Sequence, residues 1–309
     1  MSPTPSRRSD EPRLVPLAEG CWAYLQPDGG WCLNNCGVYV GDEAVTLIDT
    51  TATVARARAL RTAVARLTSL PVTTVINTHH HADHTFGNRT AAPDATVVAH
   101  RATPGAMAEA AFMVQEVWPE VDWGEIVPKP ADHVYDDRMT LPAAGRPLHL
   151  HHPGIAHTDN DTVVWDPETR VLFTGDICFS GATPYCVDGS LTGTLDALRA
   201  MTRLDPAVVV AGHGPPGGPE ILHRDIAYLE SVREGARRGL AAGRTPLEQA
   251  RATDPGPYAN LLNPERLVAN LHRAYAEEAG GDPYAPIDVP QALRDVVALA
   301  GGRTPPCHA

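Results

Sequence analysis

The chain has 309 residues, of which 43% are hydrophobic and 20% charged, the composition of an ordinary globular protein with a sizeable core. Its formal net charge of -12 argues against nucleic acid or an anionic membrane as the main partner. Residues 1–14 are polar and contain proline, with no apolar segment long enough for export or for a bilayer span. We therefore expect a disordered lead followed by a cytoplasmic protein.

The first part of the chain after this lead has the pattern of a β-sheet. Apolar runs at 21–25, 34–40 and 44–49 are separated by turn residues, which predicts hairpins. Residues 52–69 carry apolar side chains at helical spacing and predict an amphipathic helix that covers one face of the sheet. Strands at 72–76 and 95–99 follow.

Four histidines and one aspartate directly follow the strand at 72–76: His79, His80, His81, Asp83 and His84. This is the carboxyl end of a strand, where α/β sheets usually carry their chemistry. In an extended loop, side chains two residues apart share a face, so His79 and His81 can bind one cation while His80 points elsewhere. Asp83 and His84 open the next turn toward a second site. Imidazole and carboxylate ligands suit zinc, iron or manganese.

The segment from 104 to 127 concentrates aromatic and methionine side chains more than the rest of the chain. Two interpretations stay open for it. It is either a helix packed on the core or a lid that gives the metal site an apolar, aromatic-lined mouth for a bulky substrate. Phe86, just after the metal loop, could join that wall.

Three further candidates, His157, Asp176 and His213, lie close to apolar runs and beside turn signals. In chain order the whole set resembles the ligands of the metallo-β-lactamase fold: His79, His81, Asp83, His84, His157, Asp176 and His213. The resemblance covers about residues 18 to 220 and implies an α/β protein, an αββα sandwich with a dinuclear metal site at its edge. It implies one metal on His79, His81 and His157, a second on Asp83, His84 and His213, and Asp176 as the bridge.

The domain organisation follows from this resemblance and from the pattern beyond it. We expect a catalytic domain over 15–220 and a helical extension over 221–300, and the Gly-rich tail 301–309 should be mobile. The extension shows helical periodicity at four places, 220–240, 246–253, 264–279 and 290–300. It packs on the sandwich or forms a subunit interface, which leaves a monomer or a homodimer open.

The resemblance also implies the chemistry. Two Zn²⁺ ions, with iron or manganese as alternatives, lower the pKa of a water molecule so that hydroxide is available at neutral pH. Asp83 can orient that nucleophile or accept its proton. Tyr185 is a candidate donor to the oxyanion. Asp49 either supports the metal ligands, as in the family, or caps the helix that follows it.

Substrate class depends on finer features. Asp176 stands where true β-lactamases of this fold lack a bridging aspartate. The chain therefore resembles the thioesterases, lactonases and glyoxalase II enzymes of the fold more than its β-lactamases. The segments 22–31 and 156–161 most resemble the cyclase/thioesterases of aromatic (type II) polyketide pathways. We therefore expect hydrolysis of a thioester or ester with a bulky apolar acyl group, free or bound to a carrier protein. The alternatives are a lactonase or glyoxalase II-like enzyme on a small substrate, and a non-hydrolytic diiron redox or metal-binding protein.

Overall fold

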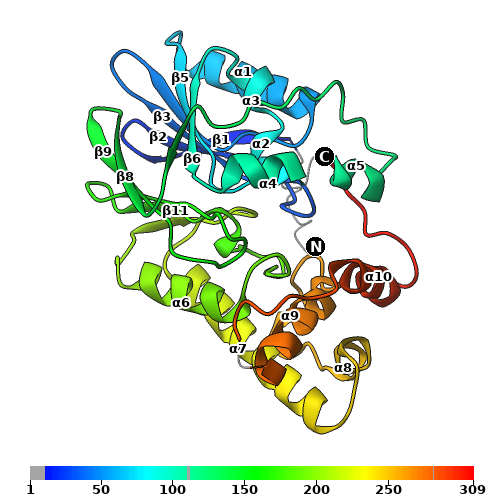
Figure 1. Cartoon of the computed structure of the whole chain (residues 1–309). Coiled ribbons are helices and arrows are strands. Elements are labelled where there is room, and N and C mark those ends of the chain that lie inside the picture. Colours follow the sequence, from blue (N-terminus) through cyan, green and yellow to red (C-terminus); the bar gives the residue numbers. More distant parts are fainter. Residues whose placement is uncertain (1–10, 110–111, 281) are drawn as a thin grey trace, which may run out of the picture.

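Two β-sheets form the centre of the protein in the computed structural model, which describes residues 11–109, 112–280 and 282–309 (Figure 1). The first sheet has seven strands in sequential order, β1 (Arg13–Ala18), β2 (Cys21–Leu25), β3 (Cys36–Val40), β4 (Val45–Ile48), β5 (Val72–Ile76), β6 (Thr96–His100) and β7 (His133–Tyr135). Strands β1 to β4 pair antiparallel, and β4 to β7 pair parallel. The predicted lead mostly falls outside the described residues, but its last two positions, Arg13 and Leu14, already belong to β1.

The second sheet has the strand order β12-β11-β10-β9-β8. Its strands are β8 (Arg138–Ala143), β9 (Arg146–His151), β10 (Val163–Asp166), β11 (Val171–Phe173) and β12 (Val208–Val210). Neighbouring strands pair antiparallel except β11 and β12, which are parallel. Side chains of both sheets meet in one core, with Ile48 and Ile76 from the first sheet and Leu148, Leu150 and Phe173 from the second.

Helices cover the two outer faces, which confirms the predicted αββα sandwich. Helix α1 (Val54–Leu67) buries Ala57, Leu60 and Val64 in a cluster with first-sheet side chains. Its amino end is capped by the Thr53 side chain, which accepts a hydrogen bond from the Arg56 amide. The outer face of the second sheet packs on α6 (Leu191–Thr202) and α7 (Glu220–Ala241).

The loops that carry the candidate ligands meet at one edge of this sandwich. Strands β5, β11 and β12 end there, and they lead into α2 (Ala82–Thr85), the 3₁₀ turn η1 (Gly175–Ile177) and the loop of His213. His157 lies on the loop that enters β10, which is antiparallel to β11 and so begins at the same edge. Helix α3 (Asn88–Ala91) follows α2. The strand directions therefore bring residues from four distant segments together.

The segment 104–127 is not one long helix. It contains α4 (Thr103–Glu109) and α5 (Met113–Val117), followed by an irregular stretch, and residues 110–111 lie outside the described part. Trp118 and Trp123 are buried in a small apolar cluster with Cys32 and Ala52. This aromatic segment is therefore anchored by its two tryptophans, while Met113 and Val117 of α5 are exposed.

The predicted C-terminal helices are confirmed as α7, α8 (Pro246–Ala252), α9 (Arg266–Gly280) and α10 (Val289–Leu299), with a 3₁₀ turn η2 (Gly256–Tyr258) between α8 and α9. They pack beneath the second sheet, and the chain then returns to α5 (Figure 1). Part of the tail 301–309, which we expect to be mobile, contacts the aromatic segment, since the Pro305 carbonyl accepts a 2.7 Å hydrogen bond from Trp118 Nε1. None of the helices in the described residues combines the length and apolar composition needed to cross a bilayer.

Candidate metal centre

One group of candidate ligands consists of three imidazoles that converge on a single point. His81 Nδ1 lies 3.0 Å from His79 Nε2 and 3.0 Å from His157 Nε2. An Asp176 carboxylate oxygen lies within 4.8 Å of these nitrogens. His79 and His157 are buried and His81 is partly buried. His80 points away, as predicted, and its Nδ1 accepts a 3.0 Å hydrogen bond from the Asn160 amide.

A second group lies beside the first and contains Asp83, His84 and His213, all buried. Asp83 Oδ2 lies 3.3 Å from His213 Nε2 and 3.7 Å from His84 Nε2. The two groups share Asp176, whose Oδ1 is 3.1 Å from His84 Nε2 and whose Oδ2 is 3.3 Å from His213 Nε2. The same Oδ2 is 3.8 Å from His157 Nε2. Asp176 thus lies where a bridging carboxylate is needed.

The chemistry of these residues fits two cations. Nitrogen and carboxylate ligands in groups of three or four are typical of dinuclear zinc sites. Among the described residues, His84 Nε2 and Asp176 Oδ1 are buried and make no hydrogen bond, although they lie 3.1 Å apart and buried polar atoms are normally paired. A cation between them would satisfy both. Zinc, iron and manganese all accept imidazole and carboxylate ligands of this kind.

The other ring nitrogen of each histidine is held by a hydrogen bond, which fixes the nitrogen that faces the metal position. His84 Nδ1 donates to Asp49 Oδ2 at 2.8 Å, and His213 Nδ1 donates to the Gly30 carbonyl at 3.1 Å. His157 Nδ1 donates to the carbonyl of Tyr185. Each of these three rings therefore presents Nε2 to the centre.

The two histidines that open the loop are held in the same manner. His79 Nδ1 donates to Thr78 Oγ1 at 3.1 Å, because that hydroxyl is itself a donor to Asp49. His81 is reversed, since its Nε2 lies 3.3 Å from Asp188 Oδ2 and its Nδ1 faces the centre. The supporting role predicted for Asp49 matches its contacts, whereas the alternative, a helix cap, belongs to Thr53. Asp188 was not found from the sequence, because it stands in no recognisable motif.

The pKa values of the imidazoles differ between the two groups. Burial lowers the pKa of His79 well below its usual value and that of His157 to about 4. Burial also opposes charge on His213, but the Asp176 carboxylate outweighs it and raises the pKa to about 9. The pKa of His84 is raised in the same way by Asp176 and Asp49. The carboxylates around the second group therefore favour positive charge there. When no metal is bound, protons on the imidazoles supply that charge.

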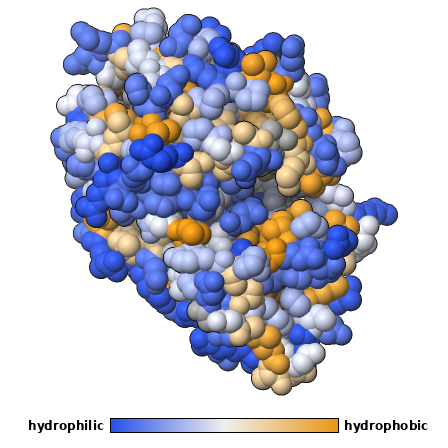
Figure 2. Space-filling model, viewed as in Figure 1, coloured by the Kyte–Doolittle hydropathy of each residue, from blue (hydrophilic) through white to orange (hydrophobic). Residues whose placement is uncertain are grey.

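A pocket of about 660 Å³ opens over the candidate metal ligands. One wall consists of Val114, Val117 and Trp118 of the aromatic segment, and the opposite wall includes Leu293 and Val297 of α10. Figure 2 shows hydrophobic residues on both sides of a hollow between the two halves of the molecule. The aromatic segment thus forms the mouth of the site, as one of the two interpretations expected, and Phe86 joins it.

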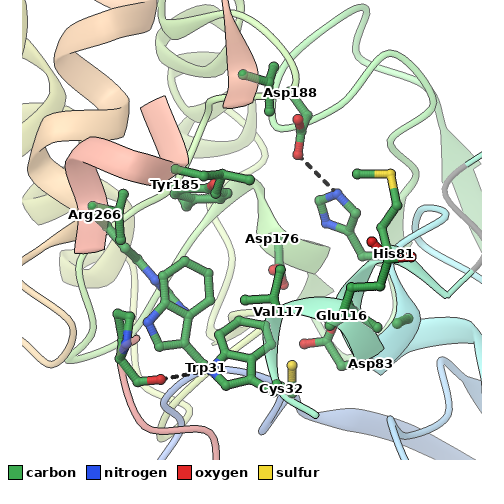
Figure 3. A pocket seen from close by; sticks show the side chains of 18 of the residues that line it. Trp31, Cys32, His81, Asp83, Glu116, Val117, Asp176, Tyr185, Asp188 and Arg266 are labelled. Atoms are coloured by element: carbon green, nitrogen blue, oxygen red, sulfur yellow. Dashed lines mark hydrogen bonds and ion pairs between the residues drawn. The ribbon is translucent and has the colours of Figure 1, made fainter. Parts of the chain in front are cut away.

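Tyr185 also lines this pocket, where its ring is 9% exposed and packs edge-on against Trp31 with 5.3 Å between the ring centroids. Figure 3 shows Trp31, Tyr185 and Arg266 on one side of the pocket, across from His81 and Asp188. The role of the Tyr185 hydroxyl as a hydrogen-bond donor to the oxyanion stays a prediction. The backbone of Tyr185 has a separate function, since its carbonyl positions His157.

The chain is similar to several known proteins. It is 30% identical to the 2,4-dinitroanisole O-demethylase subunit alpha of Nocardioides sp. (strain JS1661) over 177 residues, 56% of this chain and 50% of that subunit. It thus spans about half the length of that relative. It is 26% identical to the metallo-beta-lactamase type 2 of Bacteroides fragilis over 238 residues, 72% of this chain and 89% of that enzyme.

Solved structures share the fold. The metallo-beta-lactamase from Pontibacter korlensis superimposes with a TM-score of 0.60 at 21% identity, covering 71% of this chain and 99% of that one. The DIM-1 metallo-beta-lactamase gives 0.58 at 19% identity, covering 72% and 98%. The family model described as the metallo-beta-lactamase superfamily matches residues 29–213, more than half of the chain. This chain therefore belongs to the metallo-β-lactamase superfamily of metal-dependent hydrolases.

Proposed function

We propose that this hydrolase cleaves a thioester or ester whose acyl group is bulky and apolar. The observation that supports this proposal is the pocket of about 660 Å³, which joins the metal ligands directly to two apolar walls. Burial of apolar surface stabilises a bound ligand by roughly 25 cal/mol per Å², so such walls favour a large acyl group over a small one. A polyketide cyclase/thioesterase is the sharper form of the proposal, with an acyl chain that is free or held by a carrier protein.

The chain's own residues have distinct roles in this proposal. His79, His81 and His157 would hold one zinc ion, Asp83, His84 and His213 the other, and Asp176 would contact both. When bound, the metals supply Lewis acidity and a water molecule of lowered pKa. Burial opposes charge on Asp83, but the imidazoles of His84 and His213 outweigh it and hold its pKa at about 2. Asp83 is therefore ionised at neutral pH in the metal-free protein, and a carboxylate at this position is suited to orient the nucleophile as a hydrogen-bond acceptor.

A panel of acyl thioesters of N-acetylcysteamine tests the proposal on the zinc-loaded protein. We expect kcat/KM to rise from acetyl through hexanoyl to naphthoyl thioesters as the acyl group fills the apolar pocket. Acyl-homoserine lactones and S-lactoylglutathione serve as the small-substrate comparison. Faster turnover of either small substrate than of the naphthoyl thioester would overturn the proposal.

A second candidate is hydrolytic cleavage of an activated aryl ether. It is favoured by the 30% identity to the 2,4-dinitroanisole O-demethylase subunit alpha and by the aromatic residues at the mouth of the pocket. 2,4-Dinitroanisole therefore belongs in the same panel. Release of dinitrophenol from it, without turnover of any thioester, would favour this second candidate.

A further inference from the structure

Arg266 is a buried cation beside the candidate metal centre. It is the first residue of α9, only 2% of its surface is exposed, and it lines the pocket. Its guanidinium carbon lies 4.0 Å from the centroid of the Trp31 ring and 5.1 Å from that of Phe179. Figure 3 shows that it extends from the helical side of the pocket, across from His81. A positive charge is thus presented in a largely apolar pocket, which a second arginine, Arg294 of α10, also lines.

The hydrogen-bonding capacity of this guanidinium is mostly unused within the described residues. Nη1 donates to the Thr183 carbonyl at 3.1 Å, and the buried Nε has no partner. The neighbouring carboxylate of Glu265 forms no ion pair with it, and its Oε1 accepts a 2.7 Å hydrogen bond from Trp31 Nε1. Burial lowers the pKa of Arg266, the direction expected for a desolvated cation.

Aromatic contacts do not replace the missing acceptors. A ring beneath the guanidinium plane attracts its charge, but the N–H groups lie in that plane and still need oxygen partners. Arg273, a buried arginine on the same helix, shows the contrast. Its Nε, like that of Arg266, has no partner among the described residues, but both of its terminal nitrogens donate to backbone carbonyls, to Ala285 at 2.5 Å and to Val187 at 2.8 Å, and it does not line the pocket. Arg273 fastens the helix, whereas Arg266 retains donors for a ligand.

We propose that Arg266 binds an anionic oxygen, a carboxylate or an enolate, on the acyl group of the substrate. This inference rests on the proposed function, since it states which charged group the bulky acyl chain carries at the side that faces Arg266. The carboxylates of Asp176, Glu265 and Asp83 already favour the charge of this guanidinium, and an incoming anion would add the direct ion pair that none of them forms in the described residues. The substrate would then be an amphipathic acyl chain, apolar along its length and negatively charged at the Arg266 side.

Binding measurements test this inference without any turnover. The probes are 2-naphthoate and its neutral analogue 2-naphthamide, titrated by calorimetry into the zinc-loaded protein. We expect Arg266→Gln to weaken 2-naphthoate binding by about tenfold or more, as for a lost charge-assisted hydrogen bond, with 2-naphthamide changed less than about twofold. Arg273→Gln is the matched control and should alter neither probe selectively. Equal 2-naphthoate affinity in Arg266→Gln and the unmodified protein would overturn the inference, since the carboxylate would then be bound elsewhere, for example by the metals.

Two further measurements separate the possible failures. Circular dichroism and zinc content report whether Arg266→Gln is folded, and Arg266→Lys, which keeps the charge but loses the planar donors, should bind 2-naphthoate with intermediate affinity. A thioester of adipic acid compared with its methyl ester extends the test to turnover. If thioesters react but Arg266→Gln leaves the preference between these two unchanged, this inference fails and the proposed function stands. If no thioester reacts while 2-naphthoate binding depends on Arg266, the proposed function fails and the anion site stands.

Discussion

Asp49 Oδ2 lies 2.8 Å from Nδ1 of His84, directly behind the second group of candidate ligands. The same carboxylate accepts hydrogen bonds from the Thr78 amide at 2.7 Å and from its hydroxyl at 2.6 Å. Asp49 follows β4, and Thr78 belongs to the loop after the adjacent parallel strand β5. One buried side chain therefore fixes both the course of the metal loop and the orientation of one of its imidazoles.

Replacing this carboxylate should weaken the metal site. In Asp49→Asn the amide cannot match all three donors, so we expect zinc affinity of the Asp83–His84–His213 group to fall by about 10- to 100-fold. Competition with a chromogenic chelator measures this affinity. Asp166→Asn is the control, because Asp166 is equally buried but pairs with Arg146. Unchanged affinity in Asp49→Asn would show that His84 needs no carboxylate behind it.

Metal binding should depend on pH differently in the two groups. The pKa of His213 is raised to about 9 and that of His84 is also raised, so without metal both carry a proton at pH 7 that a cation must displace. In the first group, His157, with a pKa of about 4, and His79 are already neutral, and only His81 has a raised pKa. Lowering the pH from 8.5 to 6 should therefore reduce the zinc affinity of the second group more than that of the first. Zinc titrations of the metal-free protein at both pH values test this, and an equal loss for both ions would contradict it.

The aromatic segment should determine substrate preference through its exposed side. Val117 lies on α5 and lines the pocket. Val117→Asp places a charge against the apolar acyl group, so we expect KM for a naphthoyl thioester to rise by about tenfold, with little change for an acetyl thioester. Val127→Asp is the control, since Val127 is similarly exposed and lies outside the pocket lining. An equal change in KM in both variants would show that the aromatic segment does not contact the substrate.

The candidate metal ligands could be predicted from the sequence, but several of the groups that hold them in position could not. His79, His81 and Asp83 stand in a short pattern directly after a β-branched strand, so local spacing is enough to indicate ligands. The contact of His213 with the Gly30 carbonyl leaves no trace in the side-chain pattern, because any residue could offer that oxygen. The tail 301–309 is rich in glycine and proline, which favours mobility, yet its position depends on Trp118 nearly two hundred residues earlier. Such long-range contacts arise only in the folded chain.

Tyr185 provides a test of oxyanion stabilisation. Burial raises the pKa of its hydroxyl well above the usual value, so the group keeps its proton and stays a hydrogen-bond donor at neutral pH. If it donates to the oxyanion, Tyr185→Phe should lower kcat by about 100-fold with little change in KM. The carbonyl that holds His157 belongs to the backbone and is kept in this variant, so zinc content should not change. Unchanged kcat would end this role for Tyr185.

Asp225 on α7 should limit stability at alkaline pH. Its Oδ2 accepts a 2.7 Å hydrogen bond from the Phe179 amide, and burial raises its pKa to about 7. Because the folded-state pKa lies above the unfolded value near 4, the stability from the protonated acid is full below pH 4 and is lost as pH rises through 7. Asp225→Asn keeps an acceptor for Phe179 without a charge. It should therefore stabilise the protein at pH 8 by on the order of 1–4 kcal/mol, and by less at pH 5.

Urea denaturation at pH 5 and pH 8 measures this difference. Glu230→Gln is the control, because Glu230 lies exposed on the same helix and pairs with Arg199 at the surface, where such ion pairs contribute about 0–1 kcal/mol. Its effect should be small and nearly the same at both pH values. If Asp225→Asn instead destabilises the protein equally at pH 5 and pH 8, the carboxylate is retained for its hydrogen bond to Phe179 and its ionisation costs the folded state nothing.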